Sequence, residues 1–130
     1  MSLTHNVAVN WSTGNRAISN TVSRSNSAAD SVEETVPGAS TDLEIIYALD
    51  VSAAKVIFMV CDRDLTVETN DGTTPDATVS LKAGVPLWWD STSAYYTNPF
   101  GSTDITSLFV TLAAGDDATF QLEVLKDPTP

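Results

Sequence analysis

The sequence predicts an all-β protein, a single-domain antiparallel β-sandwich or jelly-roll-like barrel of about eight to ten strands. Three observations support this prediction. Apolar and polar residues alternate with period two through most of the chain. Clusters of Gly, Asn, Asp and Pro separate the alternating runs at short intervals. No segment shows the period of an amphipathic helix, and the strands show no repeat of fixed length that would indicate a propeller or solenoid.

The length and composition fit one domain over residues 1–130. A chain of 130 residues is long enough to bury one core without a metal or a disulfide. The hydrophobic content of 42% and the charged content of 18% are typical of a globular chain and not of a disordered one. We expect residues 1–6 to form a flexible N-terminal arm, and residues 23–40 to supply further arm or loop segments.

The first expected element is a hairpin. Its apolar positions, spaced by even numbers of residues on either side of the turn, are Val7, Val9, Trp11, Ile18 and Val22. The polar cluster at residues 12–15 supplies turn residues between the two halves. Residues 23–31 are rich in Ser, Asn and Ala, which indicates a loop or a weak edge strand, and Pro37 with Gly38 marks a turn.

The middle of the chain predicts four strands. Alternation over residues 43–49 places Leu43, Ile45, Tyr47 and Leu49 on one face of a strand, and the apolar run 56–61 predicts a central strand covered on both faces. Alternation resumes on both sides of the turn signal at residues 70–72, with Leu65 and Val67 before it and Val79 and Leu81 after it.

The end of the chain predicts two further features. Gly84 and Pro86 interrupt the pattern before residues 87–89, so this segment is expected at a sheet edge or a bulge. Two alternating runs, residues 108–112 and 120–124, flank a turn signal at residues 115–117 and predict a terminal hairpin.

The charge excludes some classes of partner. The formal net charge is −11, and the six basic residues are scattered singly, so the chain lacks the basic stripe that phosphate binding requires. We expect no direct binding to nucleic acid or to anionic membranes. The sequence contains no apolar stretch long enough to span a membrane and no signal-peptide pattern at its start, so we expect a soluble protein made in the cytoplasm.

The sequence nominates no catalytic, cofactor or metal residue, and we expect no enzyme activity. His5 is the only histidine, and nothing in the sequence places a nucleophile beside it. Cys61 is the only cysteine and lies in an apolar run, where a buried inert thiol is expected. Adjacent carboxylates such as Glu33 and Glu34 point to opposite faces of a strand. Asp62, Asp64, Asp71 and Asp76 could together bind Ca²⁺, but Asp residues that cap turns are the preferred interpretation.

Aromatic residues in the second half of the chain predict an interaction surface, because exposed aromatic side chains anchor interfaces or stack on sugars. If residues 87–89 form a strand, Trp89 faces the core and Trp88 faces the opposite side with Pro86 and Asp90. The candidate surface residues are Trp88, Tyr95, Tyr96, Phe100 and Phe109. Ile46 is a further apolar residue at a nominally polar position, and packing beneath a loop remains the alternative for such residues.

Four segments carry a resemblance to a known class of protein. They are LTVETN at 65–70, TVSLKAGVPLWW at 78–89, NPF at 98–100 and DITSLFVT at 104–111. Together they resemble small β-rich virion structural proteins of tailed bacteriophages and prophages. The resemblance covers roughly the last two-thirds of the chain and implies a capsid decoration (cement) protein with no enzymatic residue.

The resemblance implies a set of partners. The expected partner is the major capsid protein or another virion protein, with the decoration protein located at the capsid surface after synthesis in the host cytoplasm. A symmetric homo-oligomer is expected, with a trimer favoured. A carbohydrate-binding β-sandwich module and a tail or head–tail connector component are the alternatives.

Overall fold

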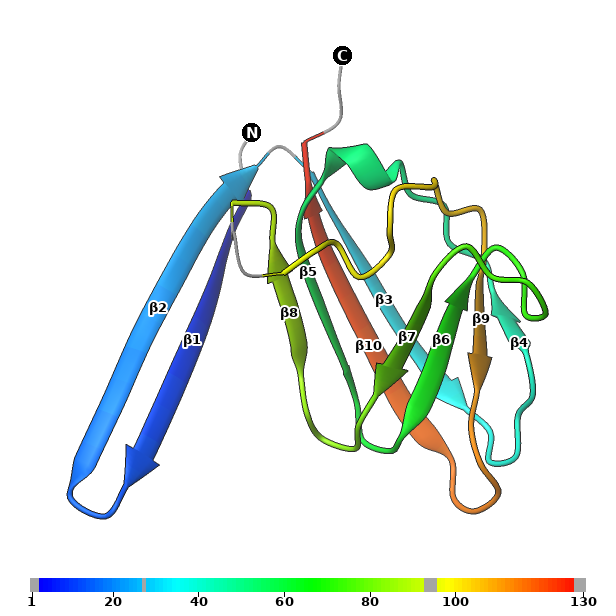
Figure 1. Cartoon of the computed structure of the whole chain (residues 1–130), viewed down its shortest axis with the longest axis horizontal. Coiled ribbons are helices and arrows are strands. Elements are labelled where there is room, and N and C mark those ends of the chain that lie inside the picture. Colours follow the sequence, from blue (N-terminus) through cyan, green and yellow to red (C-terminus); the bar gives the residue numbers. More distant parts are fainter. Residues whose placement is uncertain (1–2, 27, 93–95, 128–130) are drawn as a thin grey trace.

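The structure, a computed structural model, describes residues 3–26, 28–92 and 96–127. Within these ranges the regular elements are ten strands and one short 3₁₀ turn (Figure 1). The elements are β1 (Leu3–Thr13), β2 (Arg16–Asn26), β3 (Ala28–Val36), β4 (Leu43–Ile45), η1 (Val51–Ala53), β5 (Ala54–Cys61), β6 (Leu65–Thr69), β7 (Thr78–Leu81), β8 (Leu87–Asp90), β9 (Leu108–Thr111) and β10 (Ala118–Lys126). The predicted all-β class is confirmed. No helix in these ranges is long and apolar enough to cross a membrane.

The strands form two four-stranded sheets and a separate two-stranded ribbon. One sheet has the order β3-β10-β5-β8, the other has the order β4-β9-β6-β7, and β1 pairs only with β2. Every pairing between these strands is antiparallel. The two larger sheets face each other across the core, so the predicted antiparallel sandwich is confirmed.

The eight strands of the sandwich pair in a nested order. The first, β3, pairs with the last, β10, and the pairs β4 with β9, β5 with β8 and β6 with β7 follow inward along the chain. This pattern is that of one long antiparallel hairpin folded over into two sheets. The ribbon β1–β2 precedes it and takes no part in either sheet.

The core lies between the sheets and contains the alternating apolar residues that the sequence predicts. Ile57 and Met59 of β5 are fully buried, as are Leu122 and Val124 of the neighbouring β10. Their neighbours in sequence face outward, because successive side chains of a strand point to opposite faces. Burial on this scale is the main source of stability for a sandwich that has no disulfide.

The predicted terminal hairpin is wrong. β9 pairs with β4 and β6 in one sheet, whereas β10 pairs with β3 and β5 in the other. The turn around Gly115 carries the chain across the sandwich, so the apolar residues of both strands can face the same core. This crossing is tight: a Cβ atom on Gly38 would lie 2.0 Å from the carbonyl oxygen of Gly115.

The strand predicted over residues 43–49 is shorter than expected. β4 ends at Ile45, and Leu49 forms only an isolated bridge with Ile105. The alternation of burial nevertheless continues, with Ile45, Tyr47 and Leu49 buried. Period two therefore identified three of the four side chains on this face as buried, even where regular pairing is absent, whereas Leu43 at the start of β4 is 37% exposed.

Two expectations for the N-terminal region are corrected. The flexible arm expected over residues 1–6 is contradicted over Leu3–Asn6, which belong to β1; residues 1–2 lie outside the described ranges. The loop expected over 23–31 is mostly the end of β2 and the start of β3, apart from residue 27, which is also outside them. Pairing of β3 with β10 satisfies the backbone of a segment whose small polar side chains suggested a loop. The weak-edge alternative fits better, since β3 is an edge strand.

Candidate interaction surface

The ribbon β1–β2, called the arm below, projects from the sandwich (Figure 1). Each of its strands is eleven residues long, and the two are paired from Leu3 with Asn26 to Thr13 with Arg16. A two-residue loop, Gly14-Asn15, joins them, with Gly14 at φ 54°. A glycine with positive φ at the first loop position is typical of the type II′ turn, whose twist matches that of the strands. The predicted opening hairpin is thus confirmed.

The register makes the arm amphipathic. Residues directly opposite each other in an antiparallel pair share a face. The pairs Val7 with Val22, Val9 with Asn20 and Trp11 with Ile18 therefore place most of the apolar residues on one face. The other face carries small and mostly polar residues, namely Thr4, Asn6, Ala8, Asn10, Ser12, Ala17, Ser19, Thr21, Ser23 and Ser25.

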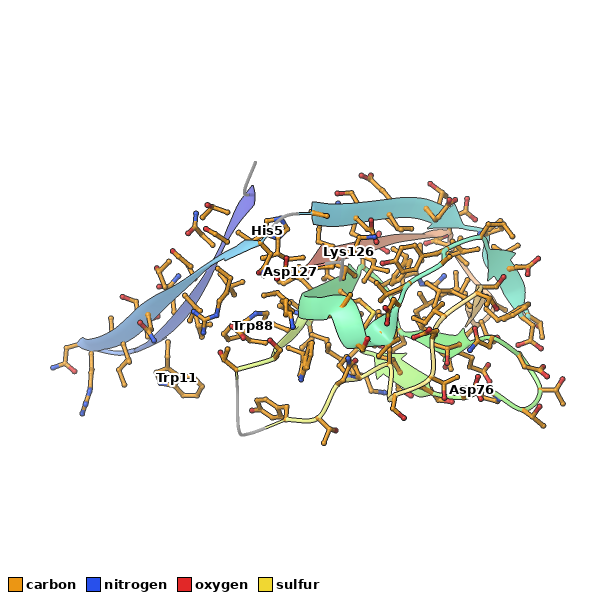
Figure 2. The ribbon with its side chains drawn as sticks, turned by 90° about the horizontal axis from the view of Figure 1, so that it is seen from above. His5, Trp11, Asp76, Trp88, Lys126 and Asp127 are labelled. Atoms are coloured by element: carbon orange, nitrogen blue, oxygen red, sulfur yellow. The ribbon has the colours of Figure 1, made fainter. Side chains whose placement is uncertain are left out.

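The apolar face is open to solvent over the outer half of the arm. The side chains of Val9, Trp11 and Ile18 are 52%, 67% and 54% exposed. Figure 2 shows Trp11 near the free end of the arm, on the same side of the ribbon as Trp88 of the sandwich. A lone two-stranded ribbon is only marginally stable in water, and exposed apolar residues along it are characteristic of a surface that another chain covers.

The base of the arm is attached to the outer face of the sheet β3-β10-β5-β8. Val56 of β5 and Leu125 of β10 are opposite each other on this outer face, yet both are buried. A hollow at the junction is lined from the arm side by residues such as His5 and Val7, and from the sheet side by Val56 and Phe58. The arm therefore has an anchored base and a free end.

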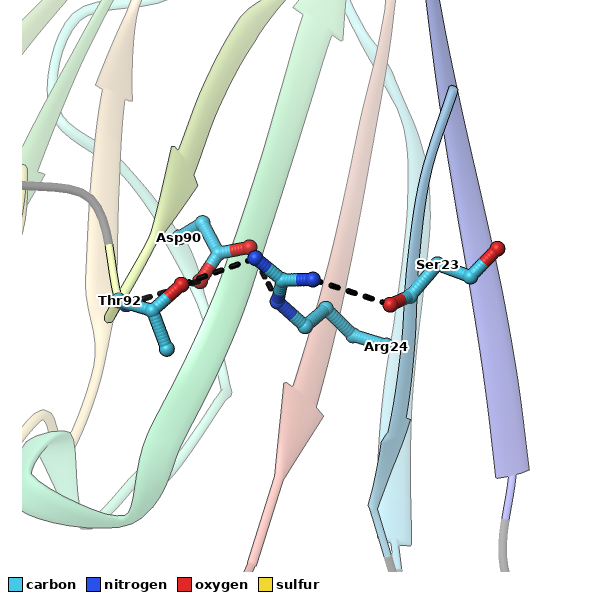
Figure 3. Close-up of polar contacts among 4 residues, drawn as sticks. All are labelled: Ser23, Arg24, Asp90 and Thr92. Atoms are coloured by element: carbon cyan, nitrogen blue, oxygen red, sulfur yellow. Dashed lines mark hydrogen bonds and ion pairs between the residues drawn. The ribbon is translucent and has the colours of Figure 1, made fainter. Parts of the chain in front are cut away.

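An ion pair fixes this base (Figure 3). Arg24 Nε of β2 lies 2.7 Å from Oδ2 of Asp90, whose side chain is only 4% exposed. These two atoms lack hydrogen-bond alignment, so their contact is ionic. Arg24 Nη2 also donates to Thr92 Oγ1 at 2.9 Å, and Asp90 Oδ1 accepts from the amide and hydroxyl of Thr92. Arg24 of the arm is thus the cationic partner of the buried Asp90 carboxylate.

A groove of about 800 Å³ lies between the arm and the edge strand β8 and is called the arm groove below. It is lined by Val7, Ala8, Val9, Asn10, Phe58, Pro86, Leu87, Trp88, Trp89, Tyr96, Thr97 and Pro99. Both walls are mainly apolar. The indole Nε1 of Trp88 is buried and has no hydrogen-bond partner in the part of the chain that the structure describes. A buried donor without an acceptor costs free energy.

The structure divides the predicted aromatic surface. Trp88 and Tyr96 both line the arm groove, and Tyr96 is largely exposed. Phe109 of β9 is half-buried on the other sheet, opposite Glu44 and Glu68, so it belongs to a separate surface. Tyr95 lies outside the described residues.

Phe100 is a correction to the predicted surface. It is fully buried and belongs to the core. A turn around Asn98 directs it inward, where the Asn98 side chain accepts a hydrogen bond from the Phe100 amide at 2.9 Å. The sequence did not reveal this, because the loop in which Phe100 lies has no periodicity.

The two adjacent tryptophans lie as the strand pattern predicts. Trp89 packs against the core cluster, while Trp88 is opposite Phe58 on the outer face of the sheet. β8 is an edge strand and β5 is central, as expected from residues 84–89 and 56–61. Ile46, the other apolar residue predicted at a polar position, is largely exposed.

The cysteine and the four aspartates that the sequence offered as chemical groups take part in packing and in turns. Cys61 is fully buried, and desolvation raises the pKa of its thiol, as expected for an inert cysteine. The described residues contain no group of three or more His, Cys, Asp or Glu that could hold a metal ion. The four Asp residues considered for Ca²⁺ instead bond within or between turns: Asp62 with Thr119, Asp64 with Ala83, Asp71 with Thr73 and Asp76 with Asn70.

The charge is divided unequally between arm and sandwich. Residues 3–26 contain two arginines, Arg16 and Arg24, and no acidic residue. Residues 28–127 contain all seventeen acidic residues and four basic ones, a net charge of −13. The net charge of the whole chain conceals this division, so it does not distinguish the arm from the sandwich. Comparing the charge of the first hairpin with that of the rest would have identified it.

Comparisons with protein families, with curated proteins and with solved structures find no match for this chain. The fold and surface define its class: an all-β protein with a two-sheet antiparallel sandwich and an amphipathic N-terminal hairpin arm.

Proposed function

We propose that this chain is a non-enzymatic bacteriophage virion structural protein, a capsid decoration protein that binds and stabilises the lattice of the major capsid protein. The observation that carries the proposal is the arm, an anchored ribbon with an open apolar face on an acidic sandwich. Such an element suits a protein that works by docking onto neighbouring subunits, because its apolar face gains stability only when another chain covers it.

The strand order supports the proposal at the level of fold. Eight strands paired first with last, in four nested pairs over two sheets, match the arrangement of a jelly roll. Jelly rolls occur in viral capsid proteins and also in lectins and cupins. By analogy the fold therefore supports a coat role, but it also fits these other functions. The segments at 65–70, 78–89, 98–100 and 104–111, which resemble phage virion proteins, add to this support.

The charge supports a surface location. A net charge of −13 on the sandwich favours solubility at high concentration, which suits a protein exposed to solvent on a capsid exterior. The expected assembly is a symmetric homo-oligomer, with a trimer favoured, at a symmetry axis of the lattice.

Binding to purified phage heads tests the proposal. Heads lacking the protein are mixed with increasing amounts of it and sedimented, and saturation at a fixed copy number per major capsid protein is the expected result. Tails from the same phage are the control. Binding to tails alone would support a connector or tail component instead, and binding to neither would refute the virion role.

A carbohydrate-binding module is the second candidate, favoured by one observation. Trp88 and Tyr96 line the same groove, and aromatic side chains in a groove can stack on sugar rings. A glycan array followed by calorimetry distinguishes the two: binding of a defined glycan that Trp88→Ala abolishes would select this candidate, and a negative array would reject it.

A further inference from the structure

The free end of the arm lacks a binding surface on its own molecule. Its base is fixed by Arg24 and by contacts with the outer face of the sheet, whereas its outer half points away from the sandwich (Figures 1 and 2). Trp11 and Ile18, opposite each other near that end, are therefore exposed together with Arg16 at the turn. A surface that covers them must come from another molecule.

The chemistry of the arm specifies this surface. The covering surface must be apolar, to bury Trp11 and Ile18, and should belong to an acidic body, to complement an arm that carries two arginines and no carboxylate. The sandwich of this same chain has an apolar groove and is acidic as a whole, although the residues that line the groove include no carboxylate. It carries a net charge of −13, and its outer sheet face presents half-buried Phe58 and Trp88 in the arm groove.

The arm groove also borders an open sheet edge. β8 is the last strand on its side of the sheet β3-β10-β5-β8. The outer edges of an incoming ribbon present backbone N–H and carbonyl groups, which can pair with such a strand edge.

We propose that the arm of one copy docks into the arm groove of a second copy, with Trp11 and Ile18 as its apolar anchors. This inference deepens the assembly part of the proposed function, and it does not depend on which shell, if any, the assembly decorates. Arm exchange of this kind either closes as a symmetric dimer or ring or continues as a chain.

Sedimentation velocity and light scattering on the isolated protein test the inference without any phage component. The wild-type chain is expected to form a defined oligomer. The double variant Trp11→Ser/Ile18→Ser is expected to be monomeric with an unchanged circular dichroism spectrum. Ile46→Ser is the matched control, since it removes a largely exposed apolar side chain from outside the arm, and it should assemble as wild type.

Cross-linking then tests the site. Mixing Ile18→Cys with Thr97→Cys, on the rim of the arm groove, should give a heterodimer with a short bis-maleimide, whereas Ile18→Cys with Ile46→Cys should not. Cys61 is buried and is not expected to compete.

Three results would overturn the inference. They are a monomer at all concentrations, an oligomer that persists in Trp11→Ser/Ile18→Ser, and equal cross-linking to positions 46 and 97. If the protein is monomeric and phage heads alone protect its arm from hydrogen exchange, the arm binds the shell and not a second copy. Self-association without binding to heads would leave this inference intact and refute the virion role, so the two failures are distinguishable.

Discussion

Removal of the Arg24 side chain should release the base of the arm. In Arg24→Met the aliphatic part of the side chain is retained, but Oδ2 of the buried Asp90 loses its cationic neighbour while Oδ1 keeps both bonds from Thr92. Breaking a fully buried ion pair costs about 3–5 kcal/mol. Arg24 is 39% exposed, so water screens part of this loss, and we expect about 2 kcal/mol.

The cost should appear first in the arm. A loss of about 2 kcal/mol at the junction corresponds to a roughly 30-fold larger equilibrium constant for opening of the arm, and so to roughly 30-fold faster hydrogen exchange of the β1–β2 amides when closing is faster than exchange. Hydrogen exchange read by mass spectrometry measures this directly, with urea unfolding as the global measurement. Arg16→Met is the matched control, because it removes the same charge from the turn end of the arm, and its exchange should match wild type.

A double-mutant cycle identifies the cause. Asp90→Asn removes the buried charge while keeping its shape, so Arg24→Met/Asp90→Asn should be more stable than the sum of the single losses predicts, by at least about 1 kcal/mol. Additive losses, or unchanged exchange in Arg24→Met, would refute the assignment of Arg24 as the fixing contact. The cycle is measured on variants kept at concentrations where the oligomeric state is the same.

Two further predictions concern the sandwich. Gly38→Ala should lower the free energy of unfolding by about 1–3 kcal/mol, because the added Cβ would meet the Gly115 carbonyl. Gly84→Ala is the comparison variant: Gly84 has φ 73° and no atom within 4 Å of an added Cβ, so only the strain of that backbone conformation is expected. Equal losses of the two variants in urea unfolding would contradict the close contact at Gly38. Burial, and then the hydrogen bond to Asp30, raises the pKa of the Tyr47 hydroxyl above its ordinary value. The neutral hydroxyl therefore stabilises the fold fully below pH ~10, and this stabilisation is lost as the pH rises further. Tyr47→Phe should flatten this alkaline loss of stability in thermal melts.

The sequence by itself determined which side chains face the core. Alternation with period two is a local property of an extended chain, so it separated Trp89 from Trp88 and predicted buried Ile45, Tyr47 and Leu49 even beyond the end of β4. Turn residues are also local, and the loop between β1 and β2 was predicted for this reason.

Only the tertiary structure decided which strands pair and what the aromatic residues do. Local pattern does not encode a partner: the strands flanking Gly115 look like a hairpin but belong to opposite sheets, because both need the same core. Phe100 and Tyr96 lie in the same aromatic segment of the sequence, yet Phe100 is buried and Tyr96 is exposed. The ion pair of Arg24 with Asp90 joins two strands that are distant in the sequence, so only the folded chain shows the anchored arm and its groove.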